Sequence, residues 1–259
     1  MRRAAATNSG RVRQEVRVQE RRRFFNVHIW RGNDHAGDYV EYEVPAYKSQ
    51  TVLDLVTWVQ RNAEPGLSYR FACRVGMCGS CAMTVNGRPR WTCRTHVEKV
   101  VENNLIEIGP LRNVPVIKDL ACDLSGFFEK WSKGHGRFVP RITRNEPVAK
   151  IPPQSKQRLE ADAGIECINC AVCYAACDSV QRNPAYLGPA ALNRAWTLLN
   201  DVRDGGQRAR LRAVSGDGGC HTCHSLQGCT SHCPNELDPA RSIAGLKRAA
   251  AMAVLKRQI

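Results

Sequence analysis

The sequence predicts an α+β protein of two domains, the first rich in β-strands and the second all-helical. Residues 24–109 are patterned as short strands around one helix, whereas the pattern after Val114 is helical. The thirteen cysteines gather in groups with metal-ligand spacing rather than scattering as disulfide partners. With 259 residues, the chain can form two modest cores, and no run of eighteen apolar residues is present to cross a bilayer.

The N-terminal half predicts its elements one after another. "FFNVHIW" (24–30) and "DYVEYEV" (38–44) have strand character, and residues 51–63 carry apolar side chains at helical spacing. Thr51, followed three residues later by Asp54, suits the N-cap of that helix. "CAMTVNG" (81–87) predicts a strand ending in an Asn-Gly turn, and "NLIEIGP" (104–110) predicts another strand. Two strands, a helix and two more strands indicate a β-grasp, plant-type ferredoxin-like domain.

The C-terminal half predicts helices. Residues 116–131 have helical spacing, residues 132–155 are rich in Gly, Pro and charge, and residues 183–202 are helical again. Asp238 and Pro239 open a last helix as N-cap and first residue. The predicted organisation is a basic disordered tail (1–23), a β-grasp domain (24–131), a connector (132–155) and an all-α bacterial-ferredoxin-like domain (156–259).

The chain is strongly basic, with 38 Lys and Arg against 24 Asp and Glu. The tail 1–23 holds eight Arg and two Glu, and it lacks the apolar stretch of an export signal; a cleaved organellar peptide stays open. No nucleic-acid-binding module is recognisable, so we expect no nucleic acid partner. A basic surface facing acidic subunits or anionic lipid is favoured instead. Clustered thiols need a reducing compartment.

The first cysteine group has the spacing of a plant-type [2Fe–2S] site. It comprises Cys73, Cys78, Cys81 and Cys93, in the pattern C-x4-C-x2-C followed by a fourth cysteine. Gly76 and Gly79 would let the backbone fold tightly around a small cluster and turn amides toward it. Zinc is the alternative, but zinc sites favour two C-x2-C pairs.

The second and third groups predict two further clusters that share their segments. Cys167, Cys170, Cys173 and Cys177 form C-x2-C-x2-C-x3-C, the run in which the fourth cysteine serves a different cluster. Cys233, which precedes Pro234, should therefore complete a [4Fe–4S] site with Cys167, Cys170 and Cys173. Cys177 would then join Cys223 and Cys229. Leu226 stands where a fourth ligand of that set is expected, so a [3Fe–4S] cluster is predicted. We expect Cys122, on an apolar helix face, and Cys220 to be bystanders.

The chain resembles the iron–sulfur subunit of succinate dehydrogenase and fumarate reductase from Phe24 to the C-terminus. The motifs that carry the resemblance are "CRVGMCGSCAMTVNG", "PVIKDL", "CINCAVCYAAC", "LGPAAL" and "HCPNELDPARSI". The resemblance implies a flavoprotein partner that carries FAD and a cytochrome b-type membrane anchor that carries haem. Electrons would pass from succinate through the [2Fe–2S], [4Fe–4S] and [3Fe–4S] clusters to a quinone, or in reverse for fumarate reduction. It also implies a peripheral position on the cytoplasmic face of the cell membrane, or the matrix side of the inner membrane.

The residues agree with that division of labour. The chain has no G-x-G-x-x-G flavin fingerprint and nothing that resembles a dicarboxylate site, so FAD and the organic chemistry would belong to a partner. This chain would carry electrons between the redox sites of its partner subunits.

The resemblance also implies quinone contacts at His224 and Lys247. The family pattern usually has Pro where Asp178 stands, Lys where Asn235 stands, and in ubiquinone-linked members a Trp where the chain reads "DSVQRN". These departures favour menaquinone. Two alternative functions remain at this stage: the iron–sulfur subunit of a different flavoprotein dehydrogenase, and a zinc-stabilised basic binding protein.

Overall fold

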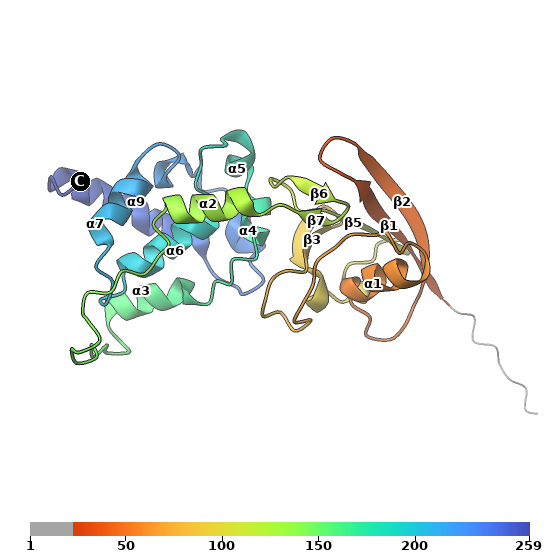
Figure 1. Ribbon diagram of the computed structural model, residues 1–259, viewed down its shortest axis with the longest axis horizontal. Coiled ribbons are helices and arrows are strands. Elements are labelled where there is room, and N and C mark those ends of the chain that lie inside the picture. Colours follow the sequence, from red (N-terminus) through yellow and green to blue (C-terminus); the bar gives the residue numbers. More distant parts are fainter. Residues whose placement is uncertain (1–22) are drawn as a thin grey trace, which may run out of the picture.

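The computed structural model describes residues 23–259, so the predicted basic tail lies, except for Arg23, outside the described residues. Figure 1 shows two lobes side by side, one built on a twisted sheet and one built of helices. The sheet lobe runs from β1 to β7, and the helical lobe contains α2 to α9. This arrangement confirms the predicted α+β class.

The sheet lobe is a five-stranded mixed sheet in the order β2-β1-β5-β3-β4. Its strands are β1 (Phe24–Gly32), β2 (Gly37–Pro45), β3 (Ala82–Val85), β4 (Arg88–Trp91) and β5 (Leu105–Gly109). β1 pairs antiparallel with β2 and parallel with β5, while β3 pairs antiparallel with both β4 and β5. The predicted β-grasp order is therefore confirmed. β4, which follows the positive-φ turn Asn86–Gly87, was not predicted.

Helix α1 (Val52–Asn62) closes the sheet lobe by packing its apolar face on the sheet. Thr51 and Asp54 form the predicted capping box: Asp54 N donates to Thr51 Oγ1 at 3.3 Å, and Thr51 N donates to Asp54 Oδ2 at 2.9 Å. Two backbone N–H groups at the helix start are thereby satisfied. The core beneath includes Ile29 and Ile106, both fully buried.

The helix predicted over residues 116–131 is wrong in its first half. That stretch forms a small hairpin of β6 (Val116–Lys118) and β7 (Ala121–Cys122), and only α2 (Ser125–Lys133) is helical. Asp119 turns the chain with a φ of +52°, and its buried carboxylate accepts from Arg31 Nε, Gly32 N and Ser68 N at 2.9–3.0 Å. These long-range bonds outweigh the local helical spacing. Cys122 lies in a strand, not on a helix face, although it is buried.

The helical lobe is made of short helices packed around a pair of longer ones. They are α3 (Lys156–Ile165), α4 (Val172–Ala175), α5 (Asp178–Arg182), α6 (Pro189–Leu199), α7 (Gln207–Ser215), α8 (Gly228–Ser231) and α9 (Pro239–Leu255). α6 and α9 pack along each other, and α3 and α7 lie beside them. Asp238 caps α9 by accepting from Arg241 N at 3.0 Å, with Pro239 as its first residue, as predicted.

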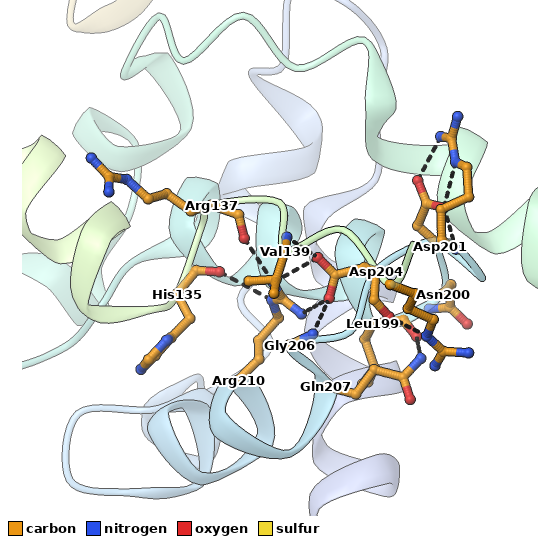
Figure 2. Close-up of polar contacts among 12 residues, drawn as sticks. His135, Arg137, Val139, Leu199, Asn200, Asp201, Asp204, Gly206, Gln207 and Arg210 are labelled. Carbon is orange, nitrogen blue, oxygen red and sulfur yellow. Dashed lines mark hydrogen bonds and ion pairs between the residues drawn. The ribbon is translucent and has the colours of Figure 1, made fainter. Parts of the chain in front are cut away.

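The first part of the segment 132–155 is tied down by a buried ion pair. Figure 2 shows Arg210 donating to the carbonyl oxygens of His135 and Arg137 at 3.0 and 2.9 Å. Its guanidinium also binds Asp204 at 2.7 Å, and Asp204 accepts from Val139 N at 2.9 Å. Both charged side chains are buried, at 1 % and 0 % exposed. After Val139 the segment has no regular structure until α3 begins, but these hydrogen bonds hold residues 135–139 against the helical lobe.

The two lobes meet through the segments that carry the cysteines. Asn113, in the loop before β6, donates its side-chain amide to the carbonyl oxygens of Tyr174 and Cys177 at 3.0 and 3.1 Å. These carbonyls lie at the end of α4 and the start of α5, so Asn113 ties the sheet lobe to the turn between these two helices. One apolar core is shared by both lobes and includes Trp91, Cys93, Val172 and Tyr186. Cysteines far apart in the sequence are therefore held in one interior.

Candidate iron–sulfur centres

The first cysteine set lies around one loop of the sheet lobe. Cys73, Cys78 and Cys81 lie before β3, and Cys93 follows β4 in a 3-10 turn (Thr92–Arg94). Strand pairing brings the last two together, because Thr92 donates from its backbone and its hydroxyl to the Cys81 carbonyl at 3.2 and 2.8 Å. Burial, followed by the neighbouring Cys81 side chain, raises the pKa of Cys93 to about 11.

The loop between these cysteines turns N–H groups toward sulfur. Met77 N and Cys78 N donate to Cys73 Sγ at 3.2 and 3.3 Å. The Cys73 backbone N–H and the Ser80 hydroxyl, 3.0 Å away, lower the pKa of Cys78 to about 6. Gly76 and Gly79 have φ values of +77° and +71°, so both adopt the left-handed conformation expected for the tight loop. Donors aimed at thiolates are what a [2Fe–2S] cluster requires of its surroundings.

The second set surrounds a single apolar cavity. Cys167, Cys170, Cys173 and Cys233 all line it, together with Trp91 and Pro234. Cys233 thus joins a trio that lies sixty residues earlier in the chain, the cross-pairing that the spacing predicted. Burial raises the pKa of Cys170 to about 11 and that of Cys173 well above its ordinary value, and the Cys233 thiolate adds to both shifts. Loading a metal cluster would therefore release protons from these thiols.

The third set is Cys177, Cys223 and Cys229. Burial is the main cause of the raised pKa at Cys177 and at Cys229, the latter to about 12, and the neighbouring cysteines of this set raise both values further. Ser225 N donates to Cys223 Sγ at 3.3 Å. Leu226, at the position of a missing fourth cysteine, is 64 % exposed at the tip of this loop. The side chains of Cys177, Cys223 and Cys229 lie near one another in this region.

The two cysteines expected to be bystanders are both buried. Cys122 packs in the shared core, where burial raises the pKa of its thiol. Cys220 is fully buried, and burial raises its pKa although the nearby Lys247 charge opposes the shift.

The two predicted quinone contacts differ in their surroundings. His224 is exposed and follows Cys223 directly. Lys247, on α9, donates from Nζ to the Cys223 carbonyl at 2.6 Å. Lys247 is therefore bonded to the loop of the third cysteine set, which a freely solvated helix charge would not be. Asn235, where the resemblance expects Lys, donates its amide to the Glu166 carbonyl at 2.8 Å.

The donor sets fit clusters better than bare ions. Within residues 23–259, no three His, Cys, Asp or Glu side chains are placed to hold one metal ion. Cysteines that bind a [4Fe–4S] or [3Fe–4S] cluster each hold a different iron, and those of a [2Fe–2S] cluster hold two irons in pairs, so they surround a space and do not all meet at one point. The cavity lined by the second set has this form. When bound, such clusters supply one-electron transfer.

Two buried aromatic residues at these sites were not predicted. Trp91 lines the cavity of the second set, and Tyr186 lies beside the third. The Trp91 indole Nε1 and the Tyr186 hydroxyl have no hydrogen-bond partner in the described part of the chain. Burial raises the pKa of Tyr186, and the thiolates of Cys223, Cys177 and Cys229 raise it further. A Trp two residues before Cys93 was the available sequence signal for the first of them.

Comparison with known proteins agrees with this layout. Residues 26–129 match the "2Fe-2S iron-sulfur cluster binding domain", and residues 166–238 match the "4Fe-4S dicluster domain". The chain is therefore an iron–sulfur protein with a [2Fe–2S] domain followed by a dicluster domain. Among residues 23–259, no helix combines the length and apolarity needed to cross a membrane.

The relatives define the family more narrowly. A fumarate reductase iron–sulfur subunit of Haemophilus influenzae is 35 % identical over 84 % of this chain and 90 % of its own. A mitochondrial succinate dehydrogenase [ubiquinone] iron–sulfur subunit of Oryza sativa is 34 % identical over 76 % and 70 %. A chain of the Mycobacterium smegmatis Sdh1 complex in the apo form superposes with a TM-score of 0.80 and 26 % identity, over 89 % and 96 %. The protein belongs to the family of fumarate reductase and succinate dehydrogenase iron–sulfur subunits.

Proposed function

We propose that this chain passes electrons between the FAD of a succinate dehydrogenase or fumarate reductase flavoprotein and a quinone at a cytochrome b-type membrane anchor. The observation that carries the proposal is the convergence of cysteines from separate segments into three sets across one continuous interior. Loops of the first and second sets touch, and Cys173 of the second set lies near Cys229 of the third. The order in space, from the first set through the second to the third, supports an electron path from the sheet lobe into the helical lobe.

Each set is proposed to hold one cluster. The [2Fe–2S] cluster would take Cys73, Cys78, Cys81 and Cys93; the [4Fe–4S] cluster Cys167, Cys170, Cys173 and Cys233; the [3Fe–4S] cluster Cys177, Cys223 and Cys229. The proposed domains are 24–131 and 156–259, with 132–155 between them. The helix α2 runs across the proposed boundary at residue 131 and packs on α6 of the helical lobe.

The end of the path at the third set is proposed to face the quinone. His224 is exposed beside Cys223, and the Lys247 ammonium lies behind the same loop, so both offer N–H donors to a quinone oxygen. Asp178 and Asn235 stand at the positions where the family pattern has Pro and Lys, which favours menaquinone. The chain would lie on the cytoplasmic face of the membrane, held by its anchor.

The purified complex tests this proposal. Succinate should drive reduction of a menaquinone analogue, and the rate should fall for a ubiquinone analogue of equal chain length. His224→Ala should lower that quinone rate while the reduction of an artificial dye by succinate stays unchanged. A complex that contains the flavoprotein and the anchor, but reduces neither quinone with succinate, would overturn the assignment.

A further inference from the structure

Trp91 occupies the boundary between the first and second cysteine sets. It ends β4, pairs with Ala82 of β3, and is 6 % exposed. On one side its ring packs on the first loop, because a Cβ atom on Gly76 would lie 3.2 Å from the indole Cζ3. On the other side the same indole lines the cavity with Cys170, Cys173 and Cys233. One rigid side chain therefore contacts both sites.

The indole N–H of Trp91 is a donor without an acceptor. Nε1 is buried and makes no hydrogen bond in the described part of the chain. Buried N–H groups are normally paired, so each exception needs an explanation. Cys170 lines the same cavity as the Trp91 indole, so its sulfur is an acceptor within the space that this N–H borders.

We propose that Trp91 Nε1 donates a hydrogen bond to the Cys170 sulfur when the [4Fe–4S] cluster is bound, and thereby raises the reduction potential of that cluster. The inference rests on the proposed ligand set, and it adds a tuning residue supplied by the other lobe. A thiolate that binds iron carries more negative charge than a thiol, so it is the better acceptor. Donors to cluster sulfurs stabilise the reduced, more negative state.

The geometry also indicates that Trp91 affects the reduction potential of only one cluster. Its six-membered ring packs against the first loop at Gly76, while the indole lines the cavity of the second set. Removing the N–H should therefore shift the potential of the [4Fe–4S] cluster and leave that of the [2Fe–2S] cluster in place. Phe can keep most of the apolar contact while it lacks the donor.

The test is a redox titration of the whole complex, followed by EPR, for the wild type and Trp91→Phe. We expect the potential of the [4Fe–4S] centre to become more negative, with the other two centres unchanged. Trp30→Phe is the matched control, because its Nε1 is also buried without a partner but Trp30 packs on Tyr39 in β2, away from the cysteine cavity. An unchanged [4Fe–4S] potential in Trp91→Phe would overturn the inference.

A second measurement uses the unaltered protein, in case the variant does not assemble. In complex labelled with 15N-tryptophan, pulsed EPR of the reduced [4Fe–4S] centre should detect coupling to one indole nitrogen, and its absence would contradict the inference. A wild-type complex without any [4Fe–4S] signal would overturn the ligand assignment as well. A normal signal without coupling overturns only the role of Trp91.

Discussion

A Cβ atom on Gly79 would lie 2.5 Å from the Cβ atom of Cys170, closer than real carbon contacts allow. Gly79 belongs to the loop of the first cysteine set, and Cys170 belongs to the second set. At the contact between the two proposed cluster sites, the backbone of Gly79 therefore packs against the side chain of Cys170. The absence of a side chain at Gly79 lets the loops approach, and a short separation between redox centres is what an electron path needs.

Gly79→Ala should therefore disturb both of these centres. The positive φ of +71° costs roughly 1–2 kcal/mol for a residue with a Cβ, and the clash with Cys170 adds to it. We expect lower occupancy of the [2Fe–2S] and [4Fe–4S] clusters, measured as EPR spin intensity per chain. Gly87→Ala is the control, since Gly87 has a φ of +72° but no atom within 4 Å of its built Cβ. Equal behaviour of the two variants would refute the close approach.

Cys233→Ser should remove the [4Fe–4S] centre and spare the [3Fe–4S] centre. Cys233 lines the cavity of Cys167, Cys170 and Cys173, although in sequence it lies four residues after Cys229. Cys220→Ser, in contrast, should leave both spectra intact. Loss of the three-iron signal in Cys233→Ser would reverse the proposed pairing.

Leu226→Cys should convert the three-iron centre toward a four-iron one. The new thiol would stand at the position that a fourth ligand would occupy, on a loop exposed enough to adjust. The oxidised three-iron EPR signal should shrink, and Leu226→Ser, which supplies no thiol, should retain it. An unaltered three-iron signal at full cluster occupancy in Leu226→Cys counts against the prediction.

Tyr186→Phe should lower the potential of the three-iron centre. The Tyr186 hydroxyl is buried, has no hydrogen-bond partner in the described part of the chain, and lies near the cysteines of the third set, Cys177, Cys223 and Cys229. Phe removes the donor and keeps the ring. Redox titration should show the shift at that centre alone, and a shift shared equally by all three centres would indicate a general structural change instead.

Asp204→Asn should destabilise the helical lobe by about 3–5 kcal/mol, because it leaves the buried Arg210 charge without its counter-ion. Urea denaturation of the complex, read as the midpoint for the helical lobe, measures the loss. Asp201→Asn breaks the more exposed pair with Arg203 and should cost under about 1 kcal/mol. Comparable losses for both variants would contradict the role of burial.

Much of this structure could be predicted from local sequence patterns. The capping box at Thr51 and the cap at Asp238 are short-range signals, and both helices begin where those residues indicated. The alternating strands β1 and β2 were equally local. Cysteine spacing predicted which thiols would lie together, since a C-x2-C-x2-C run can reach only three corners of one cluster.

The features that the sequence did not predict depend on contacts between residues far apart in the chain. The β6–β7 hairpin is fixed by the Asp119 carboxylate binding Arg31 and Ser68, so the local helical spacing of residues 116–131 was misleading. The hydrogen bonds from Arg210 to the carbonyls of His135 and Arg137 likewise span more than seventy positions. Trp91 was missed because its importance comes from a cavity that the other lobe completes.

The most direct test of the account is EPR spectroscopy of the anaerobically purified complex, recorded as isolated and after addition of succinate. The account predicts an oxidised three-iron signal that disappears with succinate, while a reduced [2Fe–2S] signal develops. A three-iron signal that stays unchanged after succinate is added would contradict the proposed electron donor. An intact sample with no iron–sulfur signal, even after chemical reduction, would contradict the assignment of clusters to these cysteines altogether.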